Sequence, residues 1–191
     1  MNNIKGLDKL LLTVLPQLKQ HDKFLDLGCG LGQKSLFLAK KGFIVTAVEK
    51  SKIMVEKVKE VIQKEKIKNI KVIHEDVLNF KIEANKFDVI MANNVLQFLP
   101  KDKALGLVEE VKDKIKNNGF IIISAFTITD PSFSLPLEKR FKTYFKPREI
   151  KKLFANFKII YYLEDTILDQ AHPGVLKPHK HGVVKIIGQK I

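Results

Sequence analysis

Apolar residues recur with helical and strand spacing along most of the 191-residue chain. Six positions near the N-terminus share one helical face, which predicts a helix within residues 1–20; they are Leu7, Leu10, Leu11, Val14, Leu15 and Leu18. Seven short apolar runs, bounded by turn residues or helical patterns, predict strands. These runs are residues 23–27, 43–48, 70–73, 87–91, 120–126, 158–163 and 183–189.

Helical patterns separate most of these strands. They cover residues 33–41, a segment beginning after the N-capping Ser51, residues 103–116 and a short stretch near 148–154. Such alternation predicts an α/β fold, a Rossmann-like three-layer sandwich with a mostly parallel seven-stranded sheet and an antiparallel last strand. Residues 127–148 and 165–182 contain prolines and no sustained period, so we expect them to be insertions on the substrate side.

Length and composition fit one domain over residues 1–191, with 45% hydrophobic residues to form a core. The single cysteine, Cys29, excludes an internal disulfide and suits a cytoplasmic location. No apolar run approaches the roughly 20 residues of a membrane span, and no signal-peptide pattern is present. We therefore expect no membrane partner, and nothing in the sequence indicates the oligomeric state.

The formal net charge of +13 raises the question of an anionic partner. Only Arg140 and Arg148 are arginines, the residue that phosphate sites favour for its two-pronged pairing. Lysines alternate with acids along the predicted helices, which favours a solvated basic surface over a nucleic-acid-binding face. Residues 138–158 combine eight basic and two acidic side chains with aromatics. This segment fits a cationic lid, an RNA-stacking surface or a solvated helix with aromatic core contacts.

A glycine-rich turn directly follows the first predicted strand. Gly28, Gly30 and Gly32 allow a sharp turn into a helix and close approach of a ligand to the backbone. A nicotinamide fingerprint would place its third glycine at position 33, where this chain has Gln33. Asp26, just before the turn, would repel a pyrophosphate but attract an ammonium group, such as that of S-adenosylmethionine.

Further polar residues follow the next strands, at the edge where α/β sheets bind ligands. Glu49 is placed to accept hydrogen bonds from ribose hydroxyls, and the adjacent Lys50 is assigned to the same site. Asp76 is placed to accept from an adenine amino group, with the Val77 amide near the ring. Asn93, after the fourth strand, is expected to contact the cofactor.

Together, Asp26–Gly32, Glu49, Asp76 and Asn93 resemble the motifs of class I S-adenosylmethionine-dependent methyltransferases. More narrowly, residues 26–39 (DLGCGLGQKSLFLA) and 94–99 (NVLQFL) resemble the tellurite-resistance methyltransferase family. The resemblance implies a small enzyme that methylates oxyanions or small nucleophiles of tellurium and selenium. It also implies a late histidine before the last strand, to which His172 is the nearest match; the arginines expected beside it are absent.

The acceptor is expected to be a small molecule, and an anion is among the candidates. Base amino-group methylation would call for prolines after Asn93, which are missing, and pyrimidine C5 methylation would need a cysteine other than Cys29 in the cofactor turn. His172, His179 and His181 are the candidate catalytic residues, in a substrate or proton-handling role. No carboxylate or cysteine lies between them and methyl transfer requires no metal, so no metal is assigned. An RNA-directed methyltransferase and, less favoured, an NAD-dependent oxidoreductase remain the alternatives.

Overall fold

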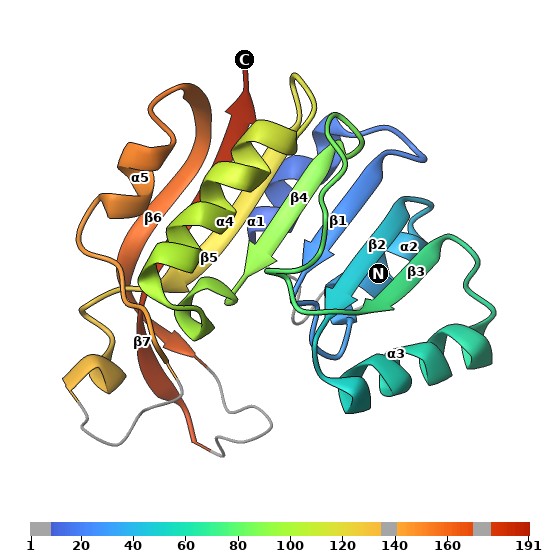
Figure 1. Cartoon of the computed structure of the whole chain (residues 1–191), viewed down its shortest axis with the longest axis horizontal. Coiled ribbons are helices and arrows are strands. Elements are labelled where there is room, and N and C mark those ends of the chain that lie inside the picture. The colour runs from blue at the N-terminus through green and yellow to red at the C-terminus, as the bar shows by residue number, and fades with distance from the viewer. Residues whose placement is uncertain (1–8, 135–140, 170–176) are drawn as a thin grey trace.

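One seven-stranded sheet forms the centre of the protein (Figure 1). The structure is a computed structural model that describes residues 9–134, 141–169 and 177–191. The strand order is β3-β2-β1-β4-β5-β7-β6. The first five strands are parallel, whereas β7 lies antiparallel between β5 and β6. Their bounds are β1 (Lys23–Leu27), β2 (Ile44–Glu49), β3 (Ile70–His74), β4 (Val89–Asn93), β5 (Phe120–Phe126), β6 (Phe157–Asp169) and β7 (His179–Lys190).

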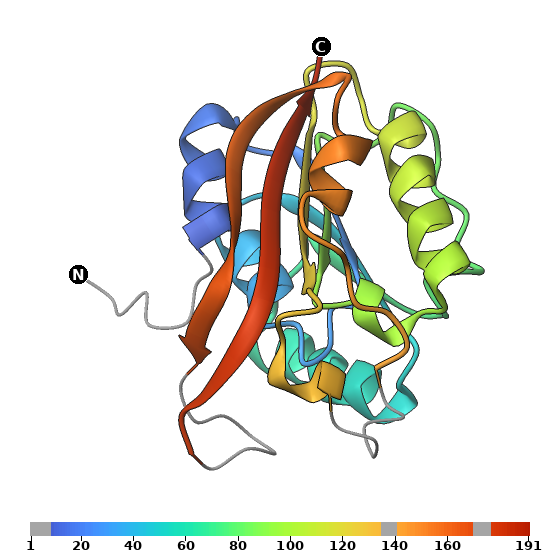
Figure 2. The ribbon, with the colours of Figure 1, turned by 90° about the vertical axis from the view of Figure 1, so that its left-hand side faces the viewer.

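Helices cover both faces of the sheet, as the edge-on view shows (Figure 2). On one face lie α1 (Lys9–Val14) and α2 (Gln33–Lys40), and on the other lie α4 (Lys101–Lys114) and α5 (Glu149–Leu153). The remaining helix, α3 (Lys52–Glu65), connects β2 to β3. Short 3-10 turns occupy Leu15–Gln17, Leu96–Phe98 and Pro131–Ser134. Among the described residues, no helix combines the length and apolar character needed to cross a membrane.

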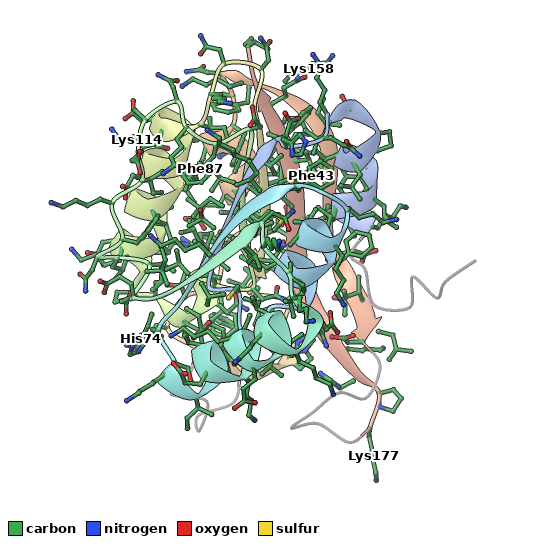
Figure 3. The ribbon with its side chains drawn as sticks, turned by 90° about the vertical axis from the view of Figure 1, so that its right-hand side faces the viewer. Phe43, His74, Phe87, Lys114, Lys158 and Lys177 are labelled. Carbon is green, nitrogen blue, oxygen red and sulfur yellow. The ribbon has the colours of Figure 1, made fainter. Side chains whose placement is uncertain are left out.

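Two apolar clusters fill the space between sheet and helices, because successive strand residues point to opposite faces. On β5, Ile121 and Ile123 join the cluster beneath α4, while Ile122 joins the cluster beneath α1 and α2. Phe43 and Phe87 lie inside the protein, whereas Lys114, Lys158 and Lys177 project outward (Figure 3). The α/β sandwich with an antiparallel last strand is therefore confirmed.

The expected loop at residues 165–182 is wrong at both ends. β6 continues to Asp169 and β7 begins at His179, so the two strands form a long antiparallel ribbon in which Asp169 pairs with His179. Residues 165–169 at the far end of β6 are exposed or half-buried, so burial imposes no apolar alternation on that part of the strand. Smaller differences are that β4 lies two residues later than expected and that α4 begins at Lys101.

Replacing the fully buried Ile90 of β4 by alanine should lower the free energy of unfolding by about 2–5 kcal/mol, since the change removes core contacts and leaves a cavity. Ile53 of α3 is 70% exposed and provides the matched control. There, the same substitution should change stability by less than about 0.5 kcal/mol. Urea denaturation monitored by circular dichroism measures both, and equal losses would contradict the central position of β4.

Candidate functional site

The glycine turn between β1 and α2 is held in place by hydrogen bonds to the end of β2. The amides of Gly28 and Cys29 both donate to the Val48 carbonyl, at 2.8 and 3.0 Å. Gly28 has φ +69°, and a Cβ there would lie 2.6 Å from a methyl carbon of Val95. Gly32 has φ +69° as well, and a Cβ there would lie 2.9 Å from Val58. Both positions combine a left-handed backbone with contacts too close for any side chain.

Two hollows flank this turn, and both are lined by Gly28. The first has a volume of about 360 Å³. Its lining residues are Gly28, Gly30, Glu49, Lys50, Ser51, Met54, Asp76, Val77, Asn94, Val95, Phe98 and Leu99. The second, of about 330 Å³, is lined by Asp26, Gly28, Cys29, Leu31, Gln33, Lys34 and Asn93. The strand order changes direction between β1 and β4, where open α/β sheets bind their ligands.

Glu49, in the first hollow, is fixed by two backbone donors. Its Oε2 accepts a hydrogen bond from the Gly30 amide at 3.0 Å, and its Oε1 accepts one from the Ser51 amide at 2.8 Å. A carboxylate offers about four acceptor positions, so each oxygen retains capacity for a ligand hydroxyl. Asp76 accepts from the Leu78 amide through Oδ1 at 3.0 Å. The remaining walls are largely apolar, which suits a flat ring between hydrophobic side chains.

Asp26, in the second hollow, has a different environment. It is only 4% exposed, and its Oδ2 accepts a hydrogen bond from the Ser35 hydroxyl at 2.6 Å. Burial raises the pKa of Asp26 from 3.8 to about 6, while the Ser35 hydrogen bond and Lys34 oppose the shift and Glu49 adds to it. A carboxylate so poorly hydrated gains free energy from a cation placed beside it. The hollow therefore favours a ligand that carries a positive charge next to Asp26.

Cys29 has no nucleophilic role in this arrangement. Burial raises the pKa of its thiol above the usual range, and the negative charges of Asp26 and Glu49 raise it further. The thiol therefore stays protonated at neutral pH. This agrees with its predicted role as a small packing side chain in the turn.

The structure separates the predicted residues into the two hollows. Glu49, Lys50, Asp76 and Val77 line the first, Asp26, Gln33 and Asn93 line the second, and Gly32 lines neither. The residues that the sequence did not assign to the site include Ser51, Met54, Phe98, Leu99 and Lys34. Met54 shares a helical spacing with Val58 and Val61, and that apolar spacing was the available signal.

Of the predicted catalytic histidines, the two that the structure describes do not line these hollows. His172 lies outside the described residues, while His179 and His181 lie at the start of β7 rather than in a loop. The Nδ1 atom of His181 is 2.8 Å from Oδ2 of Asp130, a buried carboxylate shortly after β5 that the sequence did not indicate. The acidic neighbours of these histidines, Asp130 and Asp169, come from other segments of the chain and do not lie between the histidines in sequence.

Known proteins resemble this chain in sequence and in fold. The family model described as tellurite resistance protein TehB matches residues 14–172. A probable S-adenosyl-L-methionine-dependent methyltransferase TehB from Haemophilus influenzae is 28% identical over 143 residues, which cover 75% of this chain and 48% of that protein. The chain thus spans about half the length of the curated relatives that it matches first.

Solved structures agree with this fold. The crystal structure of TehB from Haemophilus influenzae has a TM-score of 0.82 at 23% identity, covering 99% of this chain and 64% of the other. Magnesium protoporphyrin IX methyltransferase from Synechocystis, solved with bound SAM, has a TM-score of 0.68 at 17% identity and covers 95% of this chain and 76% of its own. Since the family model spans most of the sequence, the chain belongs to the TehB family of tellurite resistance proteins.

Proposed function

We propose that this protein transfers a methyl group from S-adenosylmethionine to a small-molecule acceptor. The observation that carries the proposal is the pair of unlike hollows that meet at Gly28. One combines acidic side chains with apolar walls, and the other places a buried carboxylate and a lysine together. S-adenosylmethionine has the same two parts, a nucleoside and a zwitterionic amino acid, joined at the sulfonium.

The methionine end fits the second hollow. Its ammonium group would pair with Asp26. Its carboxylate would lie near Lys34 and the amino end of α2, which has no side-chain cap and whose backbone N–H groups favour negative charge. The adenosine end fits the first hollow. There Glu49 would accept from the ribose hydroxyls and Asp76 from the adenine amino group, with Val77, Phe98 and Leu99 against the ring.

Membership of a family described by tellurite resistance favours a small acceptor such as a metalloid oxyanion, and a thiolate is the alternative small nucleophile. Methyl transfer from a sulfonium relies mainly on positioning and exclusion of water, because the leaving group is already activated. The aromatic residues of segment 138–158 argue against an RNA-stacking surface. Phe145 and Phe154 are fully buried, and Phe141 packs against Phe98 and Phe126.

Transfer of a labelled methyl group tests the acceptor class. We expect product with tellurite, selenite or a small thiol, and none with bulk RNA. Chromatographic separation of the labelled products identifies the acceptor. Label recovered only in RNA, or in none of these acceptors while S-adenosylhomocysteine binds, would contradict the proposal.

The Gly28→Ala substitution should weaken S-adenosylhomocysteine binding at least about tenfold, because a left-handed alanine costs about 1–2 kcal/mol and the turn must also move away from Val95. Gly106→Ala in α4 is the matched control, since a Cβ there meets nothing within 4 Å. Its cofactor affinity should be unchanged. Titration calorimetry gives the affinities and thermal denaturation reports folding; unchanged binding by the Gly28 variant would exclude the turn from the site.

Cofactor affinity should depend on the ionisation of Asp26. The pKa of about 6 means that lowering the pH through 6 neutralises the carboxylate, so affinity for S-adenosylhomocysteine should fall about tenfold per pH unit below that value. Asp26→Asn should lower the affinity at pH 7 about 10- to 100-fold, the loss expected for a charge-assisted hydrogen bond, and abolish the acidic decline. Calorimetric titrations between pH 5 and pH 8, with ~1-unit spacing, measure this.

The same pKa shift predicts that the stability of the cofactor-free protein changes with pH in the direction opposite to that of cofactor affinity. A raised carboxyl pKa stabilises the folded chain below the unfolded value near 4, and this contribution is lost as the pH rises through about 6. Asp26→Asn should remove that part of the pH dependence. A pH-independent affinity in the unmodified protein would rule out Asp26 as the ammonium partner.

A further inference from the structure

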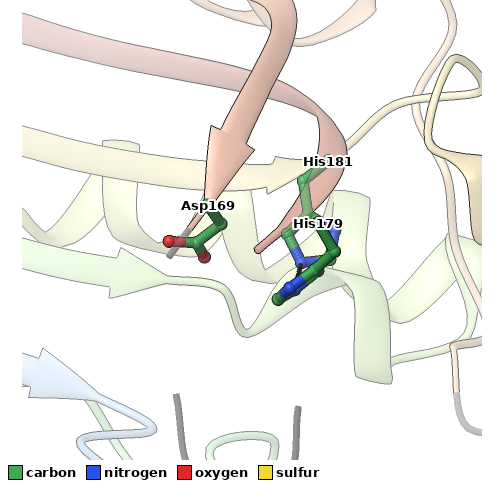
Figure 4. Close-up of side chains that lie close together, drawn as sticks. All are labelled: Asp169, His179 and His181. Carbon is green, nitrogen blue, oxygen red and sulfur yellow. Dashed lines mark hydrogen bonds between the residues drawn. The ribbon is translucent and has the colours of Figure 1, made fainter. Parts of the chain in front are cut away.

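Three side chains capable of binding a metal ion meet on the ribbon formed by β6 and β7 (Figure 4). Asp169 is the last residue of β6 and pairs in register with His179, the first residue of β7. His181 lies two residues further along β7 and so shares a face with His179. The candidate ligand atoms of the three residues all lie within 4.8 Å of one another.

The hydrogen bonds of Asp130 fix the tautomer of His181. Asp130 is 3% exposed, and its carboxylate accepts from the backbone amides of Ser132 and Gly182 at 2.9 and 3.1 Å. It therefore acts as an acceptor toward His181 as well, so that Nδ1 of His181 carries the proton and donates at 2.8 Å. The ring also stacks on Phe126, with centroids 4.6 Å apart, which holds its orientation.

His179 has the same tautomer for an independent reason. Its Nδ1 lies 3.1 Å from the Lys177 carbonyl oxygen, which can only accept a hydrogen bond. Nδ1 of His179 therefore also carries a proton. In both neutral rings the lone pair is then on Nε2, and these two Nε2 atoms face each other at 2.9 Å.

Two facing lone pairs repel each other unless a cation lies between them. Metal-binding histidines have this same arrangement, with one ring nitrogen on the metal and the other N–H donating to a carboxylate or a carbonyl oxygen. Nitrogen ligands at about 2.0–2.1 Å around tetrahedral zinc lie about 3.3 Å apart, so a small rotation of either ring would admit the ion.

We propose that His179, His181 and Asp169 form a binding site for a divalent transition-metal ion of the zinc class, with Asp130 orienting the ring of His181. Two imidazoles and one carboxylate suit zinc and its neighbours, whereas calcium and magnesium prefer oxygen ligands. Three protein ligands leave a coordination position open for a water molecule or another small ligand. The site lies outside both cofactor hollows, so it stands independently of the proposed methyl transfer.

Calorimetric titration of the full, untagged chain with zinc chloride after chelator treatment tests the site. We expect one saturable zinc per chain, and affinity reduced at least about 100-fold in the His179→Ala/His181→Ala double variant. Asp130→Asn should lose about 10- to 100-fold, the usual effect of removing a residue that orients a metal ligand. Cobalt binding should give visible absorption bands that the double variant lacks.

His74→Ala is the matched control, because His74 lies at the end of β3 and its Nε2 contacts the Lys50 carbonyl instead. This variant should retain the zinc affinity of the unmodified chain. Thermal denaturation checks separately that each variant is folded. No saturable zinc binding, or equal affinity in the double variant, would overturn the metal site and indicate a proton shared between the two rings.

Discussion

The close approach of the glycine turn to three neighbouring segments is the constraint on which the site depends. The turn is tied to Val48 by two amide hydrogen bonds, while Gly28 and Gly32 leave no room for a Cβ beside Val95 and Val58. These contacts join the ends of β1 and β2 to the segment after β4 and to α3. The backbone of the turn therefore separates the two hollows and fixes their relative position.

The two acids beside this turn have contrasting environments. Glu49 is satisfied by two backbone N–H donors, which preorganise its carboxylate for further hydrogen bonds. Asp26 is buried, and its carboxylate accepts a hydrogen bond from the Ser35 hydroxyl. Loss of hydration disfavours the charged carboxylate and raises the pKa of Asp26. Glu49 can therefore recognise a ligand by directed hydrogen bonds, whereas Asp26 is stabilised strongly by a cation placed beside it. The two kinds of recognition need acids at two different strands.

Much of the fold follows from the sequence because burial on both faces leaves a strong signal. The runs at Lys23–Leu27 and Phe120–Phe126 were predicted at their observed bounds, since both are mainly apolar, as central strands of a parallel sheet are, and each is bounded by turn residues on at least one side. The far end of the β6–β7 ribbon was missed because its polar residues resemble a loop. Its pairing depends on tertiary contacts such as the one between Asp130 and Gly182.

The residues of the candidate sites likewise fall into a group that the sequence predicts and a group that it does not. Asp26, Glu49 and Asp76 could be found because each lies within two residues of the end of a strand, in a regular pattern. Asp130 and Asp169 could not be assigned to the histidines, because 51 residues separate Asp130 from its partner and Asp169 reaches its neighbours only through strand register. Sequence spacing predicts contacts within an element, but it does not identify side chains that distant segments bring together.

Local rather than net charge explains how a chain of formal charge +13 would bind a cationic cofactor and a metal ion. Several lysines form short-range pairs on the surface, such as Lys59 with Glu56 and Lys112 with Glu109. Charges of this kind are screened over a Debye length of about 8 Å at physiological salt. Buried carboxylates are screened far less, and Asp26 and Asp130 are both buried beside a proposed ligand site. Binding of the cationic cofactor or of a metal ion therefore depends on those two desolvated acids. The excess lysines lie on the solvated surface, where salt screens their charge.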